Sequence, residues 1–183
     1  MEAAEPTSPA PVQPARSGRR PRDMAMSLLV LLVPIAIVVG AQKYLFDGDK
    51  PIAVSPAQAI ADARASGAFP VAEPGPLPDG WTVTSARFQR PADGATLRLG
   101  YVTPDAEPAL LVQSSVPADQ LLARELGDTA KAGGPVAVDA VSWQRYDSTR
   151  GEPALVLREA GRTIVVVGAT DEPTLRELAA AVS

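Results

Sequence analysis

Four carboxylates near the C-terminus could carry acid–base chemistry: Asp139, Asp147, Glu152 and Glu159. Paired carboxylates cleave glycosidic bonds, one as proton donor and the other as base or nucleophile. No spacing singles out a pair among these four, and one face of an antiparallel sheet is commonly polar in any case. The aromatic content, 4%, is also low for stacking against sugars. A cell-envelope enzyme using carboxylate acid/base chemistry is therefore only the alternative to a non-catalytic protein.

The chain contains no histidine and no cysteine. Histidine is the commonest general base and metal ligand, so its absence excludes Ser-His-Asp triads and conventional zinc sites. Without cysteine, the chain forms no disulfide and has no thiol nucleophile. Asp47 and Asp49 lack the further oxygen ligands of a calcium loop, and Lys131 lies in a glycine-rich loop instead of a desolvated pocket. We therefore expect no catalytic residue, no metal and no cofactor.

Two tryptophans and two arginines are the candidates for a ligand or partner surface. Trp81 and Trp143 could each rim a ligand pocket, although such a tryptophan is more often a core anchor whose N–H is hydrogen bonded. Arg145 and Arg158 belong to an arginine group that could meet an anionic partner. Acidic residues are interleaved with these arginines, which favours a solvated face of mixed charge.

An uncharged run over residues 24–41 indicates contact with a lipid bilayer. As a helix, its 18 residues would extend about 27 Å, close to the ~30 Å hydrocarbon core. Arginines precede the run and acidic residues follow it, as the positive-inside rule expects for a cytoplasmic N-terminus. We therefore predict a single-pass protein of the plasma membrane whose C-terminal domain is extracytoplasmic. The preceding arginines are Arg16, Arg19, Arg20 and Arg22.

A cleaved signal peptide is the alternative to a retained anchor. Val39-Gly40-Ala41 resembles the small-x-small pattern that signal peptidase accepts. The apolar stretch is longer than a usual signal core and follows a long N-terminal region, which favours the anchor. Cleavage after Ala41 would secrete the domain, and retention would tether it.

Four regions follow from this organisation. Residues 1–23 contain five prolines and no apolar period, which predicts a disordered cytoplasmic tail. Residues 24–41 are the predicted transmembrane helix. Residues 42–80 are predicted as a juxtamembrane connector, a short helix ending at Gly67, and a Pro-rich linker or surface strap. Residues 81–183 are predicted as one extracytoplasmic α+β domain.

Within the last region, apolar patterning predicts a mostly antiparallel sheet of six to seven strands. Val83 is expected on one face of the first strand, with Ala86 and Phe88 on the other. The β-branched run over residues 164–167 is typical of a strand buried on both faces. The predicted strands cover residues 81–89, 96–103, 109–116, 135–138, 141–146, 153–158 and 163–169.

Two helices complete the predicted domain. Leucine spacing indicates a short helix over residues 118–126, followed by a loop over 128–134. A C-terminal helix is expected to begin at Thr170 or Asp171 and to pack across the sheet through one apolar stripe.

The charge balance bears on the partner. Residues 43–183 carry 13 Lys and Arg against 18 Asp and Glu, a net charge of −5. This balance lacks the basic footprint of a nucleic-acid-binding protein. The expected partner is therefore an envelope protein or ligand, and not a nucleic acid.

Three strand motifs carry a family resemblance: Pro78-Asp79-Gly80-Trp81, the segment over residues 96–104, and Leu111-Val112-Gln113-Ser114. Trp143 and the segment over residues 165–170 fit as well. Together they resemble a family of actinobacterial single-pass membrane proteins, domain of unknown function 4245. The resemblance covers most of residues 24–183. It implies a single-pass anchor and an exported α+β domain, and it implies no activity and no functional residues.

These features predict a non-catalytic, membrane-anchored module of the cell envelope that binds outside the cytoplasm. A structural stalk whose cytoplasmic tail does the signalling is a further hypothesis.

Overall fold

The computed structural model describes Met26, residues 28–38 and residues 52–183. Residues 28–38 are helical with exposed side chains. Among the described residues, no helix is both long enough and apolar enough to cross a membrane. The predicted tail over residues 1–23, both ends of the predicted membrane helix, and the bond after Ala41 lie outside the described residues. The C-terminal compact unit spans Lys50–Ser183.

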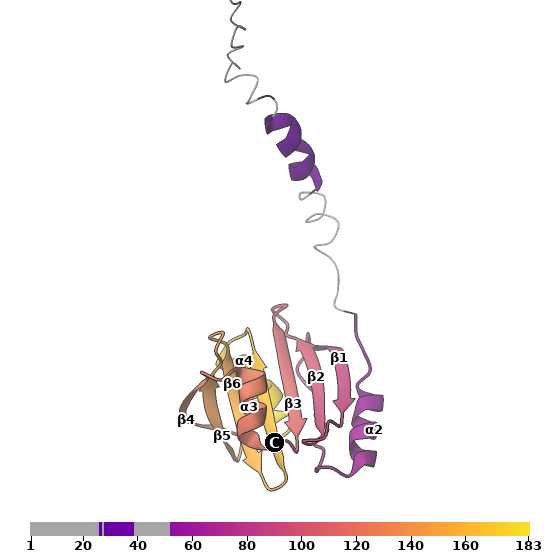
Figure 1. The fold of residues 1–183 in the computed structure, drawn as a ribbon, viewed down its shortest axis with the longest axis vertical. Coiled ribbons are helices and arrows are strands. Elements are labelled where there is room, and N and C mark those ends of the chain that lie inside the picture. The colour runs from indigo at the N-terminus through magenta and orange to yellow at the C-terminus, as the bar shows by residue number, and fades with distance from the viewer. Residues whose placement is uncertain (1–25, 27, 39–51) are drawn as a thin grey trace, which may run out of the picture. The chain divides into compact units, whose positions relative to one another are not determined.

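Seven strands in this unit form one antiparallel sheet, with the order β1-β2-β3-β7-β6-β5-β4 (Figure 1). Two meanders, β1 to β3 and β4 to β7, meet where β3 pairs with β7. The prediction of a mostly antiparallel six- to seven-stranded sheet with a C-terminal helix is confirmed. The elements are α2 (Ala57–Ser66), β1 (Thr82–Gln89), β2 (Thr96–Val102), β3 (Pro108–Ser114), α3 (Ala118–Leu126), β4 (Lys131–Val138), β5 (Val141–Asp147), β6 (Pro153–Glu159), β7 (Arg162–Gly168) and α4 (Glu172–Ala180).

Helices cover both faces of the sheet. Ile164 and Val166 of β7 belong to a core shared with α2 and α4, whereas Val165 and Val167 belong to a second core shared with α3. All four side chains are buried, so the predicted two-sided burial of this strand is confirmed. Because side chains alternate along a strand, β7 joins the two cores through its backbone.

The register of β1 corrects the predicted side-chain pattern. Val83 pairs with Tyr101, but Ser85 pairs with Gly100, so Thr84 is an extra residue in a β-bulge. A bulge shifts the alternation by one residue. Val83, Ala86 and Phe88 consequently all pack on the core of α2 and α4, and the prediction that placed Val83 on the opposite face is wrong.

Residues 57–80 belong to the domain and do not merely connect to it. Ile60 and Ala63 of α2 are buried in the core with Phe69, so the domain begins before the predicted residue 81. Gly67 ends α2 with a positive φ of 61°, as predicted. Within α2, Gln58 Nε2 donates to Asp62 Oδ1 at 2.8 Å, one turn further along the helix.

Residues 69–80, here called the strap, cross the sheet on the side of α2 and α4. Buried Gln113 of β3 holds the strap: its side-chain oxygen accepts from Ala72 N–H at 2.9 Å, and its Nε2 donates to Ala72 C=O at 2.6 Å. Gly75 N–H also donates to Ala181 C=O at 2.8 Å, and Arg162 donates to Pro70 C=O at 2.7 Å. The predicted surface strap is thus an ordered part of the domain.

The predicted bounds of α3 and the predicted start of α4 are confirmed, but the predicted start of β4 is wrong. α3 spans the predicted residues, and the Asp171 side chain caps α4 by accepting from Thr174 N–H at 3.0 Å. β4 begins at Lys131, within the predicted loop. Its Ala132 pairs with Tyr146 across an irregular register at the glycines, and that pairing is not visible in the local sequence.

Replacing Gln113 by alanine should loosen the strap, because the N–H and C=O of Ala72 would lose their partners. Leaving buried polar groups without hydrogen bonds costs about 1–3 kcal/mol. We expect the melting temperature to fall by several degrees, measured by circular dichroism on the purified chain in mild detergent. The control is Gln120→Ala, which changes an exposed glutamine on α3. Equal melting temperatures for the two variants would contradict this role of Gln113.

Candidate functional site

Trp143 lies in the core and not at a surface. Its side chain is 0% exposed, and among the described residues no atom accepts a hydrogen bond from its indole N–H. The burial fits a core anchor, but the hydrogen bond that such an anchor usually makes is missing. Trp143 therefore contributes packing rather than a contact surface.

The two candidate arginines lie on opposite faces of the sheet. Arg145 Nε lies 2.8 Å from a carboxylate oxygen of Glu172, at the start of α4. Arg158 Nη2 lies 3.3 Å from Asp119 of α3 and 3.3 Å from the Tyr146 hydroxyl. Each arginine already has an acidic partner, so the structure does not bring the pair together as one anion site.

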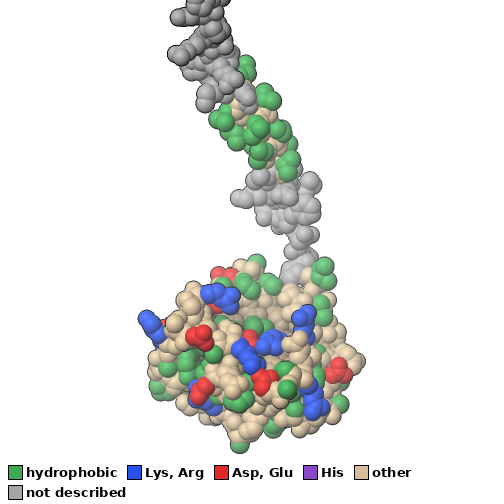
Figure 2. Space-filling model, viewed as in Figure 1, with side chains coloured by type: hydrophobic (Ala, Val, Ile, Leu, Met, Phe, Trp, Pro, Cys, Tyr) green, Lys and Arg blue, Asp and Glu red, His purple; other side chains and the backbone are tan. Residues whose placement is uncertain are grey.

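The charges on the face that carries α3 are mixed, as the interleaved sequence predicts. Figure 2 shows basic and acidic side chains interspersed over this face. Arg98 pairs with Glu125, and Arg124 pairs with Asp93, in contacts between the sheet or its loops and α3. The Arg124–Asp93 pair is partly exposed and contributes little to stability, and the mixed charges offer no field of one sign.

Among the sequence candidates, Trp143 and Arg158 border a hollow formed by residues of β4, β5 and β6, and Trp81 lines a different cavity. The Trp81 ring is half-buried and meets Tyr101 edge to face, with ring centroids 6.0 Å apart and an interplanar angle of 80°. Its indole N–H donates to Glu177 of α4 at 3.0 Å. These contacts hold the ring in one orientation at the cavity wall.

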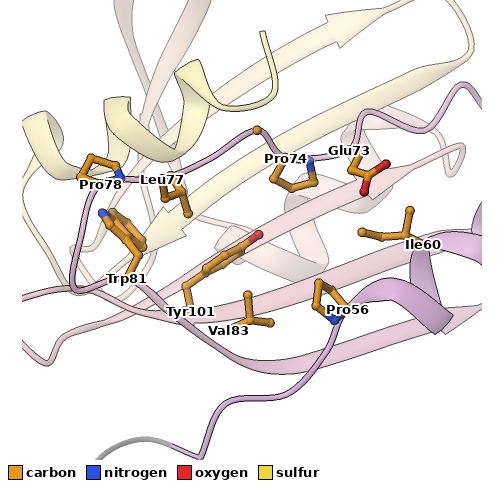
Figure 3. A pocket seen from close by; sticks show the side chains of 10 residues that line it. Pro56, Ile60, Glu73, Pro74, Leu77, Pro78, Trp81, Val83 and Tyr101 are labelled. Atoms are coloured by element: carbon orange, nitrogen blue, oxygen red, sulfur yellow. The ribbon is translucent and has the colours of Figure 1, made fainter.

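The cavity, here called the Trp81 cavity, has a volume of about 260 Å³ and lies between α2, the strap and strands β1 and β2 (Figure 3). Most of its lining residues are apolar and none is basic, but polar atoms also form part of its wall. The strap's prolines form part of this wall and have no N–H that would need a partner. The lining residues are Pro56, Ile60, Glu73, Pro74, Gly75, Leu77, Pro78, Trp81, Val83 and Tyr101.

Tyr101 supplies a polar atom within this cavity. The residue is 4% exposed, and its hydroxyl points among the cavity-lining side chains (Figure 3). Among the described residues, none forms a hydrogen bond with this hydroxyl. Burial raises the pKa of Tyr101 to about 12, because the phenolate would lose hydration. The hydroxyl therefore stays protonated near neutral pH and is free to donate a hydrogen bond to a ligand.

Sequence reasoning missed Tyr101 as a site residue. It placed Leu97, Leu99 and Tyr101 on one face of a strand, and all three are buried. The sequence feature that could have identified Tyr101 is its hydroxyl group, which lies at the end of that apolar face in a domain that also contains a Pro-rich segment. The strap and the bulge that bring Pro74 and Val83 to this hydroxyl could not be derived from local patterning.

The four carboxylates considered for catalysis lie at both ends of neighbouring strands. Asp139 precedes β5 and Asp147 ends it, while Glu152 precedes β6 and Glu159 ends it. Glu152 pairs with Arg150, and Glu159 pairs with Arg162. In the part of the chain that the structure describes, no group of three or more acidic residues could hold a metal ion.

The fold and the cavity together define a single α+β domain: a seven-stranded antiparallel sheet with helices on both faces and a small open cavity at one edge. Residues 16–182 match the family described as Protein of unknown function (DUF4245), and the chain belongs to this family. The resemblance carried by its strand motifs is thereby confirmed. No curated protein and no solved structure matches the chain.

The raised pKa of Tyr101 predicts a loss of stability in alkali. The unfolded tyrosine ionises near pH 10, whereas the folded residue resists ionisation up to about pH 12. Stabilisation from the neutral hydroxyl is therefore fully present below pH 10 and is lost as the pH rises towards 12. We expect a steeper fall in melting temperature between these values for the native chain than for Tyr101→Phe. Parallel curves for the two proteins would contradict the assignment.

Proposed function

We propose that this chain is a non-catalytic binding module, held at the plasma membrane by residues 24–41, with its α+β domain outside the cytoplasm. The observation that supports binding is the Trp81 cavity. It is an open hollow of about 260 Å³ whose lining residues are mostly apolar. The protonated Tyr101 hydroxyl projects among these residues without a hydrogen-bond partner in the described part of the chain, which favours use of the hollow by a ligand.

The chemistry of the cavity favours binding over catalysis. A general base or acid works best when its pKa lies near the operating pH. Tyr101, at about 12, is far from that range and serves as a hydrogen-bond donor. Trp81 and Glu73, the other lining side chains with polar atoms, already bond to Glu177 and Arg64. No nucleophile paired with a base lines the wall.

The membrane location is supported by the sequence. The uncharged run over residues 24–41, the arginines before it and the acidic domain after it agree on one orientation. With an acidic domain in the envelope, an envelope protein or ligand is the proposed partner. Nucleic acid is not.

Labels at both ends of the chain test the anchor and its orientation. With one epitope before residue 1 and another after Ser183, we expect both on one polypeptide in the membrane fraction. Protease added to cells stripped of their wall should remove the C-terminal epitope and spare the N-terminal one. Separate polypeptides would indicate cleavage after Ala41, and protection of the C-terminal epitope would contradict the orientation.

Mass spectrometry of extracts from the purified chain tests ligand binding. Val83 lines the cavity, so Val83→Trp should fill it and exclude a ligand that the native chain retains. Arg87→Trp is the matched control, because it adds the same ring at an exposed position of the same strand. A compound found with the native chain and the control, but not with Val83→Trp, is the expected result. Its absence from all three, or its presence in all three, would contradict binding in this cavity.

A further inference from the structure

We propose that the Trp81 cavity binds the aliphatic chain of an uncharged lipid, with the Tyr101 hydroxyl donating a hydrogen bond to the ester or hydroxyl oxygen next to that chain. This inference rests on the proposed binding function and names the class of ligand.

The side chains that line the cavity favour an aliphatic ligand. Ile60, Leu77 and Val83 contribute branched side chains from α2, the strap and β1, and prolines of the strap complete the wall (Figure 3). An apolar ligand surface would replace water against these side chains, which is favourable in proportion to the area buried. The Trp81 ring, fixed by Glu177 and Tyr101, adds a rigid flat surface.

The size of the cavity limits how much chain it holds. Its volume of about 260 Å³ lies between an engineered cavity of ~150 Å³ that binds benzene and the pockets of ~300 Å³ and more that take drug-sized ligands. At roughly 30 Å³ for each water-sized group, the cavity accommodates about eight or nine methylene-sized groups. One chain end fits, and a two-chain lipid does not.

The polar atoms of the lining residues favour a ligand with one uncharged hydrogen-bond acceptor. Three lining residues carry polar side-chain atoms: Glu73, Trp81 and Tyr101. Glu73 accepts from Arg64 at 2.5 Å, and Trp81 donates to Glu177 at 3.0 Å. Among the described residues, the Tyr101 hydroxyl has no such partner, although the residue is 4% exposed. A ligand oxygen would replace water as the partner of this hydroxyl.

The charges at the cavity disfavour an anionic headgroup. Glu73 lines the cavity, no arginine or lysine does, and Glu177 adds a second carboxylate behind Trp81. Arg64 offsets Glu73, but Glu177 has no cationic partner within the described chain. A carboxylate or phosphate placed here would therefore meet like charge without a compensating cation. A neutral ester or alcohol avoids this repulsion.

Photo-crosslinking on the full chain in phospholipid nanodiscs tests the proposal with two probes that share one acyl chain. One probe is a monoacylglycerol with a diazirine in its chain, and the other is the corresponding fatty acid. We expect the monoacylglycerol to label cavity residues on α2, the strap and β1, identified by peptide mass spectrometry. Labelling by the fatty acid at neutral pH should be at least several-fold weaker.

Two variants separate the possible outcomes. Val83→Trp should abolish labelling of the cavity, and Arg87→Trp should not. Tyr101→Phe should reduce labelling by the monoacylglycerol about five-fold, the factor for one hydrogen bond of about 1 kcal/mol. Because that hydroxyl has no protein partner, the substitution should leave the melting temperature at pH 7 unchanged, and the reduction then reports the ligand contact.

Each contrary result has a distinct meaning. Labelling by either probe that is insensitive to Val83→Trp, or no labelling at all, would overturn the lipid proposal, and the mass-spectrometry comparison of Val83→Trp with the native chain would still decide whether the cavity binds another ligand. Labelling that depends on Val83 but is equal or stronger for the fatty acid would overturn the uncharged-lipid inference and leave the binding function standing. Labelling by the monoacylglycerol that is unaffected by Tyr101→Phe would overturn the role of the hydroxyl.

Discussion

The burial of β7 on both faces is the constraint on which the rest of the domain depends. Ile164 and Val166 face one core and Val165 and Val167 the other, so each helix layer requires the strand to stay in register. The strand pairs with β3 on one side and β6 on the other, which joins the meander of β4 to β7 to the meander of β1 to β3. A shift of one residue would exchange the two sets of side chains between unlike cores. The register of the central strand therefore fixes the positions of α3 and α4 together.

In contrast to β7, the β1 edge of the sheet, where the cavity lies, has only a light covering layer. Val54 N–H donates to Val83 C=O at 2.8 Å, so the chain before α2 covers part of this edge, and an edge of a sheet otherwise offers free backbone groups. α2 contributes mainly alanines and Ile60 to the core, and the strap contributes Phe69 with half-buried Val71, Ala72 and Leu77. These side chains cover the sheet without filling the space beside Tyr101. The cavity thus results from a light covering layer on a well-packed sheet.

The sequence was sufficient wherever structure follows from local patterning. The apolar stripe with Leu175 and Leu178 predicted α4, and the β-branched run predicted the burial of β7. The sequence did not predict features that depend on contacts between segments far apart along the chain. The bulge at Thr84 depends on pairing with β2, and the strap depends on Gln113, which lies 41 residues away from Ala72. Tyr101 was correctly assigned to an apolar face, but the role of its hydroxyl depends on both of these non-local features.

The location of the cavity along the chain bears on how such a module would work. Pro56 and Ile60, which line the cavity, follow the proposed membrane anchor by fewer than twenty residues. Even fully extended, the 15 residues from Ala41 to Pro56 span about 50 Å. The cavity wall is therefore built partly from the segment of the domain that is nearest in sequence to the proposed anchor. With the proposed anchor in a bilayer, this length would limit the distance between the domain and the lipid phase, which suits the proposed aliphatic ligand because such a ligand is poorly soluble in water.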